Sequence, residues 1–475
     1  MPPARRWAAA LVGAALLSTL AAAPALADPA TPAAPAPAAA GNDVPSKVVT
    51  AYYAGWDVYG RQYFVKDIPA TKLNVIQYAF GYPTFDEATG KVGCAPVDPW
   101  AEYQQVYWGP ENTVDGVADN YPEQRLYGNF NQIRKLKAKY PHLKVEISLG
   151  GWTKSTWFSK VAQTPERRAA VVKSCVDTFI KGDLPTGGWP ENAGGPGAAA
   201  GVFDGIDIDW EYPTQVAGGN VDPRPEDRKN ATALFQEFRT QLDTVGKSTG
   251  KHYLLTAALP ATSKSTKYFE LSKVAKILDW VNVMTYDYTV GGDQKTGPSS
   301  PFGWDPRDAN SSDLTANTVG TVVHYLQNGV PANKLVVGVP FYGIQFLRTD
   351  GLYKKHDSRG LDANTLRWDS TPNPTYRDIS KAQGLQFSRN PLTGEPSLYG
   401  TATHQLCGAF NPDGTCSAPY TESTTTLITY TDPTSIALRV ALVKSVKLRG
   451  LMAWELSQDS DDHALLTEMA RVLPH

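Results

Sequence analysis

Short apolar segments rich in β-branched residues alternate along the chain with longer segments in which apolar residues recur every three or four positions. The short segments are typical of strands that are buried on both faces of a sheet. The predicted strands cover residues 48–56, 73–80, 144–152, 203–211, 253–260, 280–288, 335–343 and 450–457.

The amphipathic segments between these strands predict helices. The segment 129–140, for example, places Phe130, Ile133 and Leu136 on one face. The other predicted helices cover residues 165–181, 224–247, 267–279, 317–328, 434–448 and 462–473. Repeated strand–helix alternation of this kind indicates an α/β protein with a parallel (β/α)8 fold, the TIM barrel. A doubly wound open sheet is the alternative, because periodicity does not show whether a sheet closes.

Three intervals between the predicted elements are too long for simple crossovers. Residues 81–128 are rich in Trp and Tyr, and residues 183–201 are rich in Gly, Pro and Ala. Residues 344–427 contain turn signals and strand-like runs of their own. We expect 344–427 to form a small α+β insertion domain between strand 7 and helix 7 of the barrel, on the face where barrel active sites lie.

The N-terminal residues 1–27 predict a signal peptide that is cleaved. Arg5 and Arg6 precede an apolar run, and the sequence Ala-Leu-Ala at 25–27 has the small-x-small form of a cleavage site. The arginine pair leaves both the general and the twin-arginine export routes open. Residues 28–46 are an Ala/Pro-rich linker, and 47–474 form the barrel domain. We therefore expect a secreted, extracellular monomer with no membrane partner after the leader is removed.

Composition narrows the choice of partners. The chain has 45 Lys plus Arg against 47 Asp plus Glu, a formal net charge of −2, which lacks the basic footprint of a nucleic-acid-binding protein. Cys407 and Cys416 enclose a short Asn-Pro-Asp-Gly loop that suits a local disulfide, which would leave Cys94 and Cys175 as a long-range pair. The spacing alone does not fix the pairing. No Cys/His ligand spacing is present, so we expect no cofactor and no zinc site.

The predicted strand 203–211 carries the strongest signal for chemistry. Successive side chains of a strand alternate between faces, so Asp207, Asp209 and Glu211 project to one side, and the apolar residues between them project to the other. Inside a barrel, such like charges disfavour one another and burial disfavours all of them, so at least one pKa must rise. Glu211, nearest the C-terminal end of the strand, is therefore the candidate general acid.

Two other interpretations of this row of carboxyl groups remain. It could be a solvated strand face, although the apolar residues on the opposite side make exposure unfavourable. It could also be a divalent-metal site, because aligned carboxylates are the oxygen ligands that Mg²⁺ and Ca²⁺ prefer.

The pattern Asp204-x-x-Asp207-x-Asp209-x-Glu211, followed by Tyr-Pro, resembles the signature of family 18 glycoside hydrolases, the chitinases. Further segments resemble motifs of that family in their expected order around the barrel. These are Ser-x-Gly-Gly at 148–151, Met-x-Tyr-Asp at 284–287, Phe-Tyr-Gly at 341–343 and a tryptophan at 454. The resemblance spans residues 47–474, and the insertion at 344–427 resembles that of the deep-cleft subgroup.

The resemblance implies a substrate-assisted retaining mechanism. Glu211 would protonate the glycosidic oxygen, and the 2-acetamido carbonyl of the substrate would attack the anomeric carbon. Asp209 would orient the acetamido N–H and share a proton with Asp207, and Tyr286 would bind the acetamido oxygen.

The resemblance also implies a set of residues that line the sugar site. Trp454 would form its floor, Asp287 would contact the distorted sugar, and Trp152 would lie on the product side. Tyr52 and Ser148 would support Asp207 from the floor of the barrel. The full set assigned to substrate binding is Trp454, Asp287, Met284, Trp152, Tyr52, Ser148 and Tyr342.

Two positions depart from the family pattern. Ile344 stands where an Arg commonly follows strand seven, and the segment 288–292 lacks the Trp that many members carry after the sixth-strand motif. Both positions belong to sugar-binding subsites, so the number of subsites and the product pattern do not follow from the resemblance.

These observations together predict a chitinase that cleaves β-1,4 linkages in chitin or N-acetylglucosamine oligosaccharides. The alternatives are an endo-β-N-acetylglucosaminidase or a peptidoglycan-directed hydrolase of the same family, a metal-dependent hydrolase, and a chitin-binding lectin without activity. The presence of Glu211 and both aspartates argues against the lectin.

Overall fold

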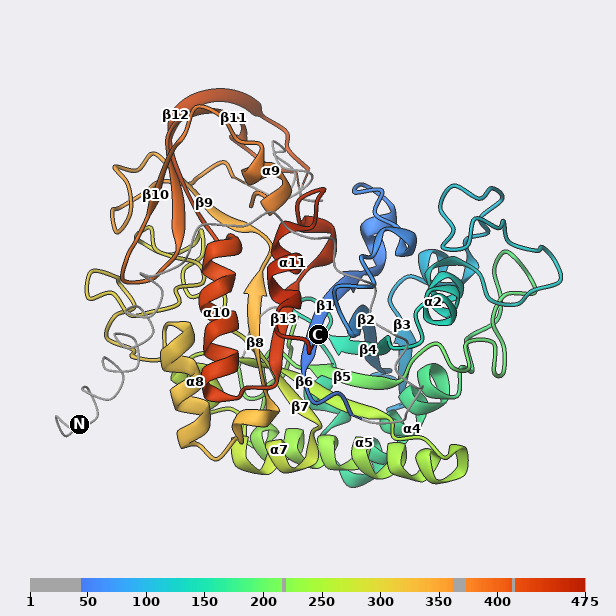
Figure 1. Ribbon diagram of the computed structural model, residues 1–475. Helices are drawn as coiled ribbons and strands as arrows, with labels where there is room; N and C mark the ends of the chain where they lie inside the picture. Colours follow the sequence, from blue (N-terminus) through green and yellow to red (C-terminus); the bar gives the residue numbers. More distant parts are fainter. Residues whose placement is uncertain (1–43, 216–218, 362–372, 412–414, 475) are drawn as a thin grey trace.

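The computed structural model describes residues 44–215, 219–361, 373–411 and 415–474. Eight parallel strands form a closed barrel, because β1 pairs with both β2 and the last strand, β13 (Figure 1). The open-sheet alternative is therefore wrong. The barrel strands are β1 (Val48–Ala54), β2 (Val75–Phe85), β4 (Lys144–Gly150), β5 (Gly205–Asp209), β6 (Leu254–Pro260), β7 (Trp280–Met284), β8 (Leu335–Pro340) and β13 (Gly450–Trp454).

Helices surround the barrel, as Figure 1 shows for α5, α7, α8 and α10. Three of these helices begin at a residue that caps them with a side-chain oxygen, namely Thr164, Asn317 and Asp432, and proline occupies the first position of α4 and α10. The helices are α2 (Gly128–Lys139), α3 (Phe158–Val161), α4 (Pro165–Cys175), α5 (Asp227–Thr249), α6 (Ser263–Thr266), α7 (Leu271–Ile277), α8 (Thr318–Gln327), α10 (Pro433–Val446) and α11 (Ala464–Ala470).

One predicted helix differs from the structure. The segment 267–279 is only partly helical, since α6 ends before it and α7 begins at Leu271. The chain turns between the two helices and buries Phe269 against the core, so tertiary packing overrides the helical periodicity there.

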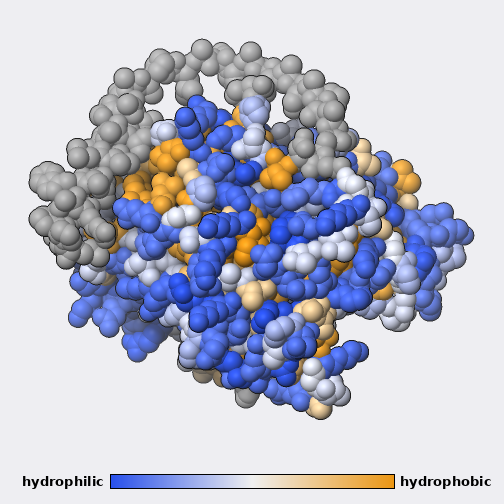
Figure 2. Space-filling model, turned by 90° about the horizontal axis from the view of Figure 1, so that it is seen from below, coloured by the Kyte–Doolittle hydropathy of each residue, from blue (hydrophilic) through white to orange (hydrophobic). Residues whose placement is uncertain are grey.

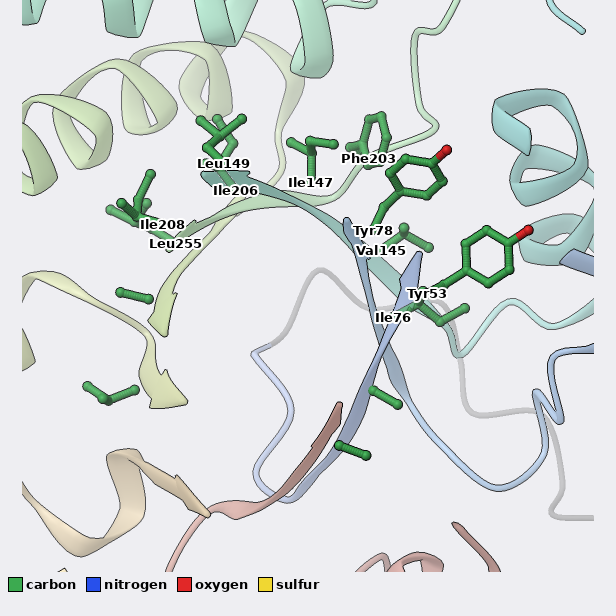
Figure 3. Packing of buried hydrophobic residues seen from close by; sticks show 14 of the residues in the cluster. Tyr53, Ile76, Tyr78, Val145, Ile147, Leu149, Phe203, Ile206, Ile208 and Leu255 are labelled. Carbon is green, nitrogen blue, oxygen red and sulfur yellow. The ribbon is translucent and has the colours of Figure 1, made fainter. Parts of the chain in front are cut away.

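The outer wall of the barrel is apolar and packs under the helices. Figure 3 shows this layer, in which Ile206 and Ile208 of β5 lie with side chains from the neighbouring strands β4 and β6. Both isoleucines and the following Trp210 are buried. The alternation predicted for this strand is thus observed, with its apolar side under the helices and its carboxyl side inside the barrel.

The segment between β8 and α10 forms a second, antiparallel sheet above the barrel in Figure 1. Its strand order is β10-β11-β12-β9, and one short helix precedes β10. Its elements are β9 (Gly343–Leu347), α9 (Tyr376–Ser380), β10 (Gln386–Arg389), β11 (Pro396–Cys407) and β12 (Pro419–Tyr430). The sheet corresponds to the predicted insertion, with bounds slightly wider than 344–427.

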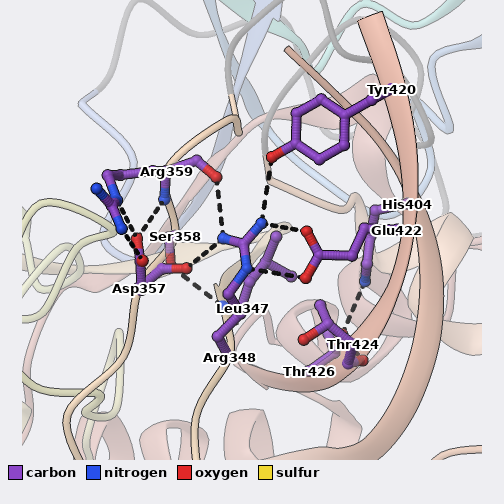
Figure 4. Close-up of polar contacts among 10 residues, drawn as sticks. All are labelled: Leu347, Arg348, Asp357, Ser358, Arg359, His404, Tyr420, Glu422, Thr424 and Thr426. Carbon is purple, nitrogen blue, oxygen red and sulfur yellow. Dashed lines mark hydrogen bonds and ion pairs between the residues drawn. The ribbon is translucent and has the colours of Figure 1, made fainter. Parts of the chain in front are cut away.

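An arginine ties the connection after β9 to this sheet. Figure 4 shows the Arg348 guanidinium between Glu422 of β12 and the backbone carbonyls of Asp357 and Arg359. Arg348 combines an ion pair with hydrogen bonds to two backbone carbonyls. Together these contacts fix the path of the connection more firmly than a single surface ion pair would.

Both disulfides join cysteines in the pairing that the short loop favours. Cys407 is bonded to Cys416 at the end of the β11–β12 hairpin. Cys94 is bonded to Cys175, which ties β3 (Val92–Pro96) to the end of α4. β3 lies in the long 81–128 interval and adds an antiparallel edge strand to β2, which the sequence did not predict.

The face seen in Figure 2 is covered mostly by hydrophilic residues, with apolar residues gathered in small areas. Within the described ranges, each helix is too short or too polar to cross a bilayer. The predicted signal peptide and all but the last residues of the predicted linker lie outside the described residues.

Candidate active site

Strand register brings the predicted site residues together inside the barrel. Asp207 of β5 lies opposite Ser148 of β4 on one side and opposite Thr256 of β6 on the other. The strand ends at Asp209, so Glu211 stands just beyond the barrel rim and not within the strand as predicted. The three carboxyl groups therefore form a row that rises from the barrel interior to its C-terminal end.

Asp207 is fully buried and holds four hydrogen-bond donors. Its Oδ2 accepts from the hydroxyls of Tyr52 at 2.9 Å and Ser148 at 2.7 Å. Its Oδ1 accepts from the Thr256 hydroxyl at 2.7 Å and the Asn282 amide at 3.2 Å. Burial raises the pKa of Asp207, and these donors oppose that rise. The lowest carboxyl of the row is thus held by the barrel itself.

Asp209 is buried but poorly supplied with partners. Its Oδ1 has no hydrogen-bond partner within the described part of the chain. Burial, followed by the charges of Glu211 and Asp207, raises the pKa of Asp209 well above its ordinary value. These surroundings favour the protonated form of Asp209 and leave one buried oxygen without a protein partner in the described ranges.

Glu211 is 9% exposed and lies at the mouth of the row. Burial, with a smaller contribution from the charge of Asp287, raises the pKa of Glu211 to about 7, although a hydrogen bond with the Tyr212 hydroxyl opposes the rise. Because Glu211 interacts strongly with Asp209, this pKa belongs to the pair. A carboxyl that is half protonated near neutrality suits both proton donation and proton acceptance.

The backbone around these acids is closely packed. Gly150 has φ 114°, and a Cβ there would lie 2.2 Å from the carbonyl oxygen of Asp209. The buried Ser155 hydroxyl donates to that same carbonyl at 3.2 Å and accepts from the Glu211 N–H at 2.9 Å. The glycine and the serine therefore fix the backbone at the end of β5, where Asp209 and the following Glu211 lie.

Aromatic rings lie beside the row. Trp454, at the end of β13, stacks on Phe80 with ring centroids 5.8 Å apart and an interplanar angle of 17°, and it contacts Tyr52 at 5.1 Å. The Tyr286 hydroxyl lies 3.9 Å from the sulfur of Met452. Met284, at the end of β7, packs against this inner cluster.

A pocket of about 300 Å³ opens next to Trp454. Asp287 and Tyr342 lie in its lining and are joined by a hydrogen bond of 2.7 Å from the tyrosine hydroxyl. Asp287 as a whole residue is exposed, but protein atoms around its carboxyl raise the pKa to about 6, and the hydrogen bond from Tyr342 opposes this rise. Trp152 is not among the residues of this pocket; it lies 55% exposed on the surface directly after Gly151.

Both departures from the family pattern fall in this pocket. Ile344 lines the pocket at the position where members of the family commonly have an Arg. Val290 lines it too, and it belongs to the segment 288–292 that lacks the family's Trp. Neither residue contributes a charge or a large ring. The departures from the family pattern therefore lie in the lining of this pocket and not in the carboxyl row.

Several residues of the site were not predicted from the sequence. Thr256 and Asn282 hold Asp207 from β6 and β7, and Ser155, Tyr212 and Phe80 contact the upper acids or Trp454. The sequence signal that could have indicated a role for Thr256 and Asn282 is strand alternation, which places both side chains inside the barrel, as it does those of the acids. No group of three or more His, Cys, Asp or Glu side chains with a metal-binding arrangement occurs in the described residues.

Residues 48–459 match the glycosyl hydrolases family 18. The chain belongs to this family. The chain is 32% identical to Chitinase A1 of Niallia circulans over 442 residues, and this alignment covers 86% of this chain and 56% of that protein. It is 36% identical to Chitinase C of Streptomyces lividans over 314 residues, and this alignment covers 63% of this chain and 44% of that protein. The chain thus spans about half the length of these relatives.

Solved structures of the family agree with this fold. The catalytic domain of psychrophilic chitinase B from Arthrobacter TAD20 is 31% identical, has a TM-score of 0.75, and covers 90% of this chain and 95% of its own. Chitinase ChiA74 from Bacillus thuringiensis is 28% identical with a TM-score of 0.71, and covers 90% of this chain and 69% of its own. Membership of family 18 and the barrel with its second sheet therefore rest on sequence and structure alike.

Proposed function

We propose that the protein is a chitinase that hydrolyses β-1,4 linkages between N-acetylglucosamine units. The observation that carries this proposal is Glu211, a carboxyl with a pKa of about 7 at the end of a buried acid row, beside an aromatic-lined pocket. The names of the relatives, which are chitinases, support chitin as the substrate.

The reaction begins with a proton transfer. Glu211 donates its proton to the glycosidic oxygen while the carbonyl oxygen of the substrate's own acetamido group attacks the anomeric carbon. The C–O bond to the leaving sugar breaks, and a cyclic oxazolinium ion remains. Glu211, now a carboxylate, accepts a proton from the water that opens this ion, so the configuration at the anomeric carbon is retained.

Asp209 assists through the oxygen that has no protein partner. Its free Oδ1 accepts the acetamido N–H of the substrate, which aims the carbonyl oxygen at the anomeric carbon. The Tyr286 hydroxyl, which lies 3.9 Å from the weak acceptor sulfur of Met452, is available to donate to the acetamido oxygen.

The pocket residues bind the sugar at the point of cleavage. The face of Trp454 offers an apolar floor to the C–H bonds of a pyranose ring, and Asp287 and Tyr342 offer hydrogen-bonding groups at its side. We propose that Trp152 lies on the product side of the cleft, as the resemblance of the 148–152 segment to the family motif implies; its 55% exposure leaves its ring available to a sugar.

We also propose that the protein is exported and acts outside the cell. The leader-like sequence at 1–27 and the presence of two disulfides support this location.

The test is digestion of defined oligosaccharides by the purified protein, with Glu211→Gln as the matched variant. We expect cleavage of a hexamer of N-acetylglucosamine and no cleavage of its fully de-acetylated counterpart, because the latter lacks the internal nucleophile. Cleavage of the de-acetylated hexamer would overturn the mechanism. The assignment of chitin as the substrate would be overturned if the protein left the hexamer intact but released a high-mannose glycan from a glycoprotein or digested peptidoglycan.

A further inference from the structure

A fourth carboxyl group lies beneath the row, and the reaction described above does not use it. Glu146 of β4 is fully buried inside the barrel. It stands in register with Gly205 of β5, two positions below Asp207, and with Gln77 of β2 on its other side. Gly205 lies tightly against β6, since a Cβ there would be 2.5 Å from the Cβ and from the carbonyl oxygen of Leu254.

The Thr256 hydroxyl lies between Glu146 and Asp207. Its oxygen is 2.7 Å from Oδ1 of Asp207 and 3.1 Å from Oε1 of Glu146. A hydroxyl has one proton and can donate to only one of two acceptors. One of the two acids must therefore be protonated and donate to Thr256, or one of the two contacts is not a hydrogen bond.

The remaining partners of the two acids show which one carries the proton. Asp207 accepts from Tyr52, Ser148 and Asn282 in addition to Thr256. The Asn282 amide is oriented as a donor to Asp207, since its own oxygen accepts the indole N–H of Trp280 at 3.0 Å. Asp207 is thus prepared to carry a negative charge.

Glu146 is not prepared for a charge. Its second oxygen, Oε2, has no hydrogen-bond partner among the described residues, and neither does the amide of the adjacent Gln77. The ionisable groups that act on Glu146 are Asp207, Asp204 and Asp279, all of them acids. Asp204 and Asp279 are engaged by Lys137 and by Arg239, respectively, at the bottom of the barrel. A carboxylate at Glu146 would be a buried charge with one donor at most.

We propose that Glu146 is a positioning residue that stays protonated and donates to Thr256, whose own proton is thereby directed to Asp207. This relay keeps the charge on Asp207, at the base of the row. A charged Asp207 is then available as an acceptor for the proton that Asp209 shares with it. The protonation of Glu146 stands by itself, whereas its catalytic consequence rests on the proposed chitinase function.

Infrared spectroscopy of the folded protein tests the protonation directly. We expect the difference spectrum between the wild type and Glu146→Gln at pH 7 to show loss of the C=O stretch of one protonated carboxyl. Loss of carboxylate bands instead would overturn the proposal. The result does not depend on activity, so it separates a failure of this proposal from a failure of the proposed function.

Thermal unfolding of the same two proteins gives a second readout. A buried acid that keeps its proton when folded, and loses it at ordinary pH when unfolded, makes the folded protein less stable as pH rises above about 4.5. The unfolding midpoint of Glu146→Gln should therefore rise above that of the wild type by a margin that grows between pH 5 and pH 8. A margin that is constant over this range would contradict a retained proton.

Kinetics of Thr256 variants test the relay. Thr256→Val removes the hydroxyl that both acids contact, so we expect kcat on a chitin hexamer to fall about tenfold with little change in KM, and the loss of activity at alkaline pH to begin at lower pH. Thr256→Ser keeps the hydroxyl and should restore both. Equal behaviour of the two variants would show that Thr256 only fills space.

Discussion

The two ends of the carboxyl row are built differently. At the lower end, Asp207 is surrounded by four donors from four different strands. At the upper end, Asp209 has an oxygen without a partner among the described residues, and the Tyr212 hydroxyl is a side-chain partner of Glu211. The lower end stabilises a fixed charge, whereas the upper end leaves its acids short of partners that a substrate can supply. The strand β5 and the two residues that follow it thus combine a structural acid with two reactive ones.

The largest effect should come from the reactive end. Replacing Glu211 by Gln removes the transferable proton but keeps the shape, so we expect kcat on the chitin hexamer to fall by about a thousandfold while binding of the hexamer persists. Single-turnover assays and calorimetric titration measure the two quantities. A variant that retains a tenth of the activity would show that Glu211 is not the acid.

The same variant should be more stable than the wild type at high pH. The folded-state pKa of Glu211, about 7, lies above its unfolded value, so the folded protein loses stability as pH rises from about 4.5 through 7. Glu211→Gln is free of this loss, and we expect it to gain up to about 3 kcal/mol relative to the wild type at pH 8. Denaturant unfolding at pH 5 and pH 8 measures the gain; equal differences at both values would contradict the raised pKa.

Matched Asp→Asn substitutions at the two aspartates test the comparison itself. Asp207→Asn places an amide against four donors, so we expect the free energy of unfolding to fall by about 1–3 kcal/mol. Asp209→Asn removes no protein hydrogen bond from Oδ1, so stability should be kept or improved while kcat falls by about a hundredfold. If both variants lose stability equally, the two ends of the row do not differ as described.

The smallest effect concerns the hydrogen bond from Tyr212. Its hydroxyl lowers the pKa of Glu211, so Tyr212→Phe should move the alkaline fall of kcat/KM upward by about half a unit. The neighbouring Tyr288, whose hydroxyl contacts Thr321 and not the acids, provides a matched control in Tyr288→Phe. A downward shift in Tyr212→Phe would mean that the hydroxyl stabilises the neutral acid instead.

Much of this structure follows from local patterns in the sequence. The barrel strands were predicted to within a few residues because each is a short apolar run buried on both faces, and the inward side of Asp207 and Asp209 follows from strand alternation. The strand end was misplaced at Glu211 because the pairing of β5 stops at Asp209, which depends on neighbouring strands. The hydrogen bonds from Thr256 and Asn282 to Asp207 could not be predicted from the sequence either, because they depend on the register of β5, β6 and β7. The edge strand β3 was missed because its sequence, Val-Gly-Cys-Ala-Pro, contains Gly and Pro and shows no alternation of polar and apolar residues.

The pH dependence of kcat/KM on a soluble chitin oligosaccharide tests the central claim most directly. If Glu211 holds its proton near neutrality, kcat/KM falls at alkaline pH with an apparent pKa of about 7, and this value belongs to Glu211 together with Asp209. A fall centred near 4.5, the value of an ordinary glutamate, would contradict the account.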